Sequence, residues 1–135
     1  MADTRLLEQT GEAYIIHQLC RYKLLLLKPY FDRIGVDLII LSDVSHSARI
    51  AVVQSKYRSV TEDRGSNVSI PCKYVHDRFF AFLYVENSTG HGELYVFYPE
   101  HIRKWNEAQG LYVLNIPKSQ QLSSLPPRHH VLLEP

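Results

Sequence analysis

Apolar residues recur along the first part of the chain at helical spacing. Between residues 4 and 22 they fall three or four positions apart, which predicts one N-terminal helix that Asp3 or Thr4 can cap. Gly11 interrupts this helix, at a cost of roughly 1 kcal/mol relative to alanine. Close approach of the helix to a sheet at Gly11 would compensate for that cost.

The pattern then changes to short apolar runs of the kind that form strands. Three of them follow in quick succession at residues 23–28, 36–41 and 50–57, each bounded by turn-forming residues. The connections between them are too short for helical crossovers. We therefore expect an antiparallel three-stranded meander.

The second half of the chain continues with strands and one short helix. The polar segment 58–67 is predicted to be an exposed loop, and a short helix is expected at 100–105, with Pro99 at its start. Further strands are predicted at residues 79–85, 93–98 and 111–116. The predicted fold class is α+β (α/β/α-like), with the N-terminal helix and the meander followed by a mixed sheet flanked by helices. Residues 1–116 are expected to form one domain, and residues 117–135 a C-terminal arm.

Composition limits the possible classes of protein without selecting one. A chain of 135 residues can bury a single core, and its formal net charge of +1 gives no overall basic field. Two cysteines do not make a disulfide framework, and neither a signal peptide nor a run long enough to span a bilayer is evident. We expect a reduced, soluble, cytoplasmic protein that does not enter a membrane.

Polar residues interrupt two of the predicted strands where burial would exclude them. Asp37 stands among aliphatic residues, and Gln54 and Lys56 share one face of the next strand because side chains alternate with a period of two. Glu12 lies about 40° from Ile16 around the helix, within its apolar stripe. Such groups cost desolvation energy unless they are paired or bind a ligand. We therefore treat these four residues as a candidate site.

Each of these residues also has a purely structural explanation. Glu12 can be a boundary residue whose stem packs while its carboxylate reaches water, and Asp37 can cap the bend before it. Lys56 alone can be a lysine that protects an edge strand. As a set, Glu12, Asp37 and Gln54 offer the hard oxygen ligands that suit Mg²⁺, for which Mn²⁺ can substitute. Such an ion can polarise a phosphoryl oxygen, and Lys56 could stabilise the charge that grows on the phosphate.

The order of these residues is similar to that of a known group of nucleases. A helical glutamate in Gly11-Glu12-Ala13, an aspartate in the run 35–39 and the ending Gln54-Ser55-Lys56 resemble the PD-(D/E)xK, or restriction-endonuclease-like, superfamily. The Gln-x-Lys variant looks like that of Mrr-type nucleases and small intron-encoded homing endonucleases. The resemblance covers roughly residues 4–116. Two positions depart from the family pattern: Val36 replaces the proline, and Gln54 replaces the acid.

This resemblance implies a metal-dependent endonuclease that hydrolyses phosphodiester bonds in DNA. It also implies that Lys56 is the catalytic lysine. Cutting two antiparallel strands with so small a domain implies a homodimer or homotetramer. Arg58, Arg64 and Lys73 are the basic residues expected to meet phosphates if they flank the site.

Two alternatives belong to other classes of protein. One is a nuclease-fold protein without catalysis that binds nucleic acid or a partner protein, which the Gln54 substitution motivates. The other is an interaction domain in which Asp37 and Lys56 form an ion pair across adjacent strands.

Overall fold

The fold is described from a computed structural model of the chain. The described residues are 4–21, 24–29, 36–42 and 49–124. The first described element is helix α1 (Thr4–Cys20), followed by the meander strands β1 (Leu25–Leu27), β2 (Leu38–Ser42) and β3 (Arg49–Ser59). The remaining elements are β4 (Ser66–Pro71), η1 (Cys72–Tyr74), β5 (Phe79–Glu86), β6 (Gly92–Phe97), α2 (Pro99–Ile102), β7 (Asn106–Ala108), β8 (Leu111–Ile116) and η2 (Ser119–Ser124).

Two sheets form the centre of the molecule. The larger has the strand order β1-β2-β3-β5-β6, and the smaller has the order β4-β8-β7. Strands β1, β2 and β3 pair antiparallel, which confirms the predicted meander. Strand β5 runs parallel to β3 and antiparallel to β6, so the larger sheet is mixed, as expected.

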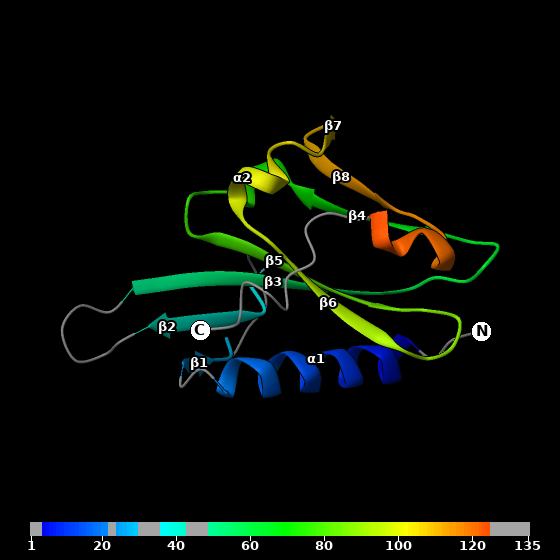
Figure 1. The fold of residues 1–135 in the computed structure, drawn as a ribbon. Coiled ribbons are helices and arrows are strands. Elements are labelled where there is room, and N and C mark those ends of the chain that lie inside the picture. Colours follow the sequence, from blue (N-terminus) through cyan, green and yellow to red (C-terminus); the bar gives the residue numbers. More distant parts are fainter. Residues whose placement is uncertain (1–3, 22–23, 30–35, 43–48, 125–135) are drawn as a thin grey trace.

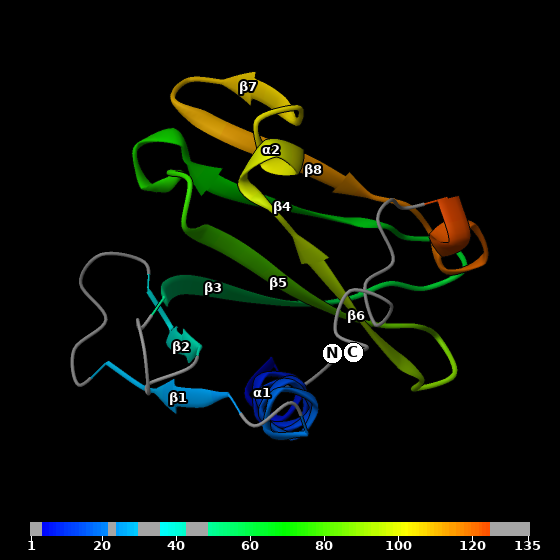
Figure 2. The same cartoon turned by 60° about the vertical axis from the view of Figure 1, so that its left-hand side comes forward.

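The layers are helix, larger sheet and smaller sheet. Helix α1 lies along one face of the larger sheet, and the smaller sheet lies on the other side in both views (Figures 1 and 2). A core cluster under α1 joins Ile15 and Leu19 to side chains of the larger sheet. A second cluster joins alternate residues of β5 to Val68 and Ile70 of β4. Strand β5 is therefore buried on both faces, which explains its continuous apolar run.

The smaller sheet corrects part of the sequence prediction. The predicted loop 58–67 is shorter, since β3 continues to Ser59 and β4 begins at Ser66. On the side of the larger sheet opposite α1, strand β4 rather than a long helix packs on β5, since α2 has only four residues. Strand β7 was also not predicted; it pairs with β8 across a turn in which both Gln109 and Gly110 have positive φ.

Part of the predicted C-terminal arm is docked on the domain. The backbone N–H of Ser119 donates to the carbonyl of Thr61 at 2.9 Å, and Leu122 packs against the second core cluster. Residues 125–135 lie outside the described part of the chain. No described helix is long and apolar enough to cross a membrane.

Candidate functional site

A cleft opens where β2 begins and β3 continues without a β2 partner. The last paired residues are Leu38 and Val53, and from Gln54 onward no strand in the described part of the chain pairs with the edge of β3 that faces β2. The cleft has a volume of about 450 Å³. It is lined by side chains from α1, the end of β1, the start of β2 and the open part of β3: Glu8, Glu12, Lys28, Pro29, Val36, Asp37, Leu38, Gln54, Ser55, Lys56, Tyr57 and Arg58. All four residues of the predicted site thus line one cleft.

Asp37 is fixed at the open edge by two hydrogen bonds. Its backbone N–H donates to the carbonyl of Val53 at 2.8 Å, and its Oδ2 accepts from the backbone N–H of Ser55 at 2.6 Å. The carboxylate therefore takes the place that a backbone carbonyl of a longer β2 would have. A charge-assisted bond of this kind orients the side chain strongly.

Gln54 and Lys56 project from the face of β3 opposite α1. Their partners on β5 are Ala81 and Leu83, which belong to the second core cluster. The amide Oε1 of Gln54 is buried and accepts no hydrogen bond from the described residues. A buried carbonyl oxygen without a donor is costly, and a cation or an ordered water would satisfy it.

Glu12 enters the cleft from α1, where Gly11 allows close contact with the sheet. A Cβ atom at position 11 would collide with the ring of Tyr57. This confirms the close approach of helix and sheet that was predicted at Gly11. The carboxylate of Glu12 accepts from Lys28, with 2.7 Å between Nζ and Oε1. That contact is the main cause of the raised pKa of Lys28, to which the charge of Asp37 adds.

The cleft combines acids and bases in equal number. Its lining includes three carboxylates, from Glu8, Glu12 and Asp37. It also includes three cationic side chains, from Lys28, Lys56 and Arg58. Burial raises the pKa of the Tyr57 phenol to about 12, and the negative charges of Glu12 and Asp37 act in the same direction. Tyr57 is therefore a neutral hydrogen-bonding group at physiological pH.

The three predicted phosphate-binding residues lie in different surroundings. Arg58 lines the cleft, where its guanidinium donates to the carbonyls of Asn67 at 2.9 Å and Tyr57 at 2.8 Å. Burial lowers the pKa of Arg58, although Glu8 opposes this effect. Arg64 is exposed in the connection from β3 to β4, and Lys73 is exposed on η1, its Nζ 5.5 Å from the centre of the Tyr74 ring. Neither of these two residues lines the cleft.

The oxygen donors of the cleft fit a weakly held hard cation. Among the described residues no three His, Cys, Asp or Glu side chains form a metal-binding group. The cleft is instead lined by the carboxylates of Glu8, Glu12 and Asp37 and by Gln54, whose amide oxygen is buried and unsatisfied. Mg²⁺ retains several waters and needs few protein ligands, so this donor set is compatible with it.

The sequence patterns missed Lys28, Ser55 and Tyr57 as members of the site. Lys28 ends an apolar run and was assigned no role. The antiparallel meander could have located it, because a meander brings the end of its first strand beside the start of its second. Ser55 contributes a backbone N–H, for which its residue type gives no signal.

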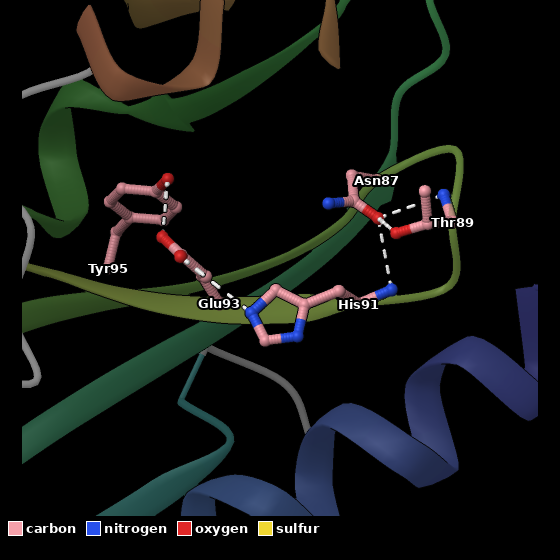
Figure 3. A network of polar contacts seen from close by, with 5 residues as sticks. All are labelled: Asn87, Thr89, His91, Glu93 and Tyr95. Carbon is pink, nitrogen blue, oxygen red and sulfur yellow. Dashed lines mark hydrogen bonds and ion pairs between the residues drawn. The ribbon is translucent and has the colours of Figure 1, made fainter. Parts of the chain in front are cut away.

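A second group of polar side chains stabilises the hairpin between β5 and β6 (Figure 3). Oδ1 of Asn87 accepts from the backbone N–H groups of Thr89 and His91, at 3.0 Å each, and from the Thr89 hydroxyl at 2.7 Å. Glu93 lies between Nε2 of His91, at 3.8 Å, and the hydroxyl of Tyr95, at 3.3 Å. These contacts account for the group as a turn-stabilising network.

Comparison with known proteins supports the fold. No family model matches the chain, and no curated protein matches it. Among solved structures, the chain is similar to a bacterial homing endonuclease, I-Ssp6803I, with a TM-score of 0.56 and 21% sequence identity. The match covers 98% of this chain and 93% of that one. The chain therefore has a nuclease-like α+β fold.

Proposed function

We propose that this protein is a metal-dependent endonuclease that hydrolyses phosphodiester bonds in DNA, of a site-specific homing or restriction type. The observation that carries the proposal is the meeting of Glu12, Asp37, Gln54 and Lys56 in one cleft, from α1, the residue before β2, and β3. The similarity of the fold to that of a homing endonuclease supports it.

Each residue has a distinct role in this proposal. Glu12, Asp37 and Gln54 would hold Mg²⁺ or Mn²⁺ through their side-chain oxygens, and the ion would act as a Lewis acid toward a phosphodiester oxygen. Lys56 would stabilise the negative charge that develops on the phosphate in the transition state. Arg58, together with the more distant Arg64 and Lys73, would contact DNA phosphates.

We further propose that two or more copies assemble, as a homodimer or a homotetramer. Two clefts related by two-fold symmetry suit the cutting of two antiparallel DNA strands by so small a domain. On the face of the larger sheet opposite α1, Leu25 pairs with Leu41, which pairs with Ile50. Leu25 and Ile50 are 46% and 49% exposed. This aliphatic row carries no charge to attract phosphate, but it is complementary to itself, which suits a second copy of the chain.

One observation favours a second candidate function. The Glu12 carboxylate already has a cationic partner in Lys28, and Gln54 supplies no negative charge. Both features weaken the attraction for a metal ion. Both features are expected of a protein that has the nuclease fold but does not cut, and that instead binds nucleic acid or a partner protein.

A cleavage assay on the purified protein distinguishes the two functions. Supercoiled plasmid is incubated with Mg²⁺ or Mn²⁺, using wild type, Asp37→Asn and Lys56→Ala, and the folding of each variant is checked by circular dichroism. We expect cleavage by wild type alone. If both folded variants still cleave the plasmid, Asp37 and Lys56 do not belong to the active site and the proposed site is wrong. Salt-dependent DNA binding without cleavage or metal binding by wild type would favour the second function.

A further inference from the structure

Lys28 lines the cleft with a largely exposed side chain. Its Nζ lies 2.7 Å from Oε1 of Glu12, and the two side chains are 69% and 33% exposed. Lys28 follows the three-residue edge strand β1, which places it beside the start of β2 and hence beside Asp37. A cation held at the end of a long, exposed stem therefore sits among the carboxylates assigned to the metal.

We propose that Lys28 competes with the metal ion for Glu12 and so sets the metal affinity of the cleft. In the metal-free protein its ammonium holds the Glu12 carboxylate toward the cleft. When a divalent cation binds, the ammonium leaves and becomes available to a DNA phosphate. This inference rests on the proposed metal-dependent function and names a residue that tunes it.

The charges in the cleft explain why such a cation is needed. Glu12 and Asp37 line the same cleft, and two like charges that share a site repel one another when no cation lies between them. Lys28 relieves this repulsion, because it is hydrogen-bonded to Glu12 and also feels the charge of Asp37. A divalent ion carries twice the charge and would interact more strongly with the same carboxylates.

The exposure of the pair explains how the ammonium can leave. Ion pairs between exposed side chains are weak, because water and salt screen them and the long side chain loses entropy when it is held. Lys28 therefore orients Glu12 without locking it. The unsatisfied Oε1 of Gln54 is a further oxygen that the ammonium does not satisfy and that a metal ion could.

The sign of the effect separates this role from a merely structural one. If Lys28 only supported the local structure, its removal would weaken metal binding. If it competes with the metal, its removal strengthens metal binding. A substitution that improves affinity cannot be explained by damage to the fold.

The test is calorimetric titration of Mn²⁺ into the full-length protein without DNA. Lys28→Met removes the charge and keeps most of the apolar stem, and Lys28→Arg keeps the charge. Lys104→Met is the matched control, since Lys104 is an exposed lysine that does not line the cleft. We expect Lys28→Met to bind Mn²⁺ about three to ten times more tightly than wild type. Lys28→Arg and Lys104→Met should stay within about twofold of wild type.

The possible failures are distinguishable. Unchanged or weaker binding by Lys28→Met, with measurable binding by wild type, overturns the competition and leaves the proposed metal site intact. Absence of Mn²⁺ binding by wild type and Lys28→Met alike overturns the metal site and, with it, this inference.

Discussion

Oδ2 of Asp37 accepts a hydrogen bond from the backbone N–H of Ser55 at 2.6 Å, just beyond Leu38 and Val53, the last paired residues of β2 and β3. The side chain thus completes the ladder that the backbone leaves open. It also presents a carboxylate in the cleft that Glu12, Gln54 and Lys56 line. One residue therefore serves both the sheet and the proposed chemistry, and the two roles can be separated by mutation.

Asp37→Ala and Asp37→Asn should differ in stability and agree in activity. Alanine leaves the N–H of Ser55 without its acceptor, so we expect a loss of about 1–3 kcal/mol in the free energy of unfolding. Asparagine retains a side-chain oxygen that can accept the bond, and its loss should be below about 1 kcal/mol. Both variants should lose metal-dependent cleavage. Urea denaturation and a plasmid assay measure the two properties, and equal losses of stability would contradict the role given to the bond.

Substitutions of Gln54 should change the response of stability to metal. Gln54→Glu places a third carboxylate where the amide oxygen is now buried, so the metal-free protein should lose about 1–3 kcal/mol. Mn²⁺ should then stabilise this variant more than wild type, by about 1.4 kcal/mol for each tenfold gain in affinity. Gln54→Met, similar in shape but without the oxygen, should fold well and respond less to Mn²⁺. Thermal denaturation with and without Mn²⁺ provides the comparison, and the same metal-induced shift in all three proteins would exclude Gln54 as a ligand.

Tyr57 should make stability depend on pH in the alkaline range. Its pKa rises from the ordinary value of 10.0 to about 12 on folding, chiefly through burial. The folded protein therefore holds the phenolic proton more tightly than the unfolded chain does. The resulting stability is fully present below pH 10 and is lost as the pH rises toward 12.

Tyr57→Phe should remove this contribution, because phenylalanine cannot ionise. Urea denaturation at several pH values between 9 and 12 would show a shallower decline for the variant than for wild type. Tyr112→Phe, at a half-buried position outside the cleft, is a suitable control. Parallel stability profiles for wild type and Tyr57→Phe would contradict the raised pKa.

The aliphatic row across β1, β2 and β3 should control assembly. Ile50→Glu places a charge in the row, and we expect it to shift the protein toward monomer, because a buried contact cannot hold an unpaired carboxylate. Leu6→Glu is the matched control: Leu6 is 61% exposed but lies on α1, away from the row. Analytical ultracentrifugation measures the mass of each. If wild type is monomeric, or if Ile50→Glu has the same mass as wild type, the aliphatic row is not the contact between copies.

The sequence predicted best the helices and strands in which apolar residues recur at regular spacing. Strand β8 was predicted with the observed bounds, residues 111–116, and the prediction for α1 differs by two residues at its C-terminal end. Strand β4 was missed because serine and asparagine alternate with Val68 and Ile70, and the segment ends in Pro71. Buried Val68 and Ile70 alternate with less buried positions, but the polar residues of the segment concealed this pattern.

The grouping of the four candidate residues was more predictable than the arrangement of strands around them. The alternation of side chains along a strand placed Gln54 and Lys56 on one face of β3. Glu12 and Asp37, which come from the predicted helix and the start of the predicted second strand, line the same cleft. The parallel pairing of β3 with β5 was not predictable in the same way, since it joins strands separated by all of β4 and η1. Likewise, the contact of Lys28 with Glu12 depends on tertiary packing between α1 and the end of β1, which no local pattern encodes.

The missing side chain at Gly11 has a consequence for anyone who would transplant this site. The ring of Tyr57 occupies the space that a Cβ atom would need, so the glycine fixes how deeply α1 settles on the sheet. Glu12 is the next residue, so the distance between α1 and the sheet determines how far its side chain extends into the cleft. A designer who copied the four polar residues onto another helix and sheet would obtain the side chains without their spacing. The glycine and the tyrosine would have to be copied with them as one unit.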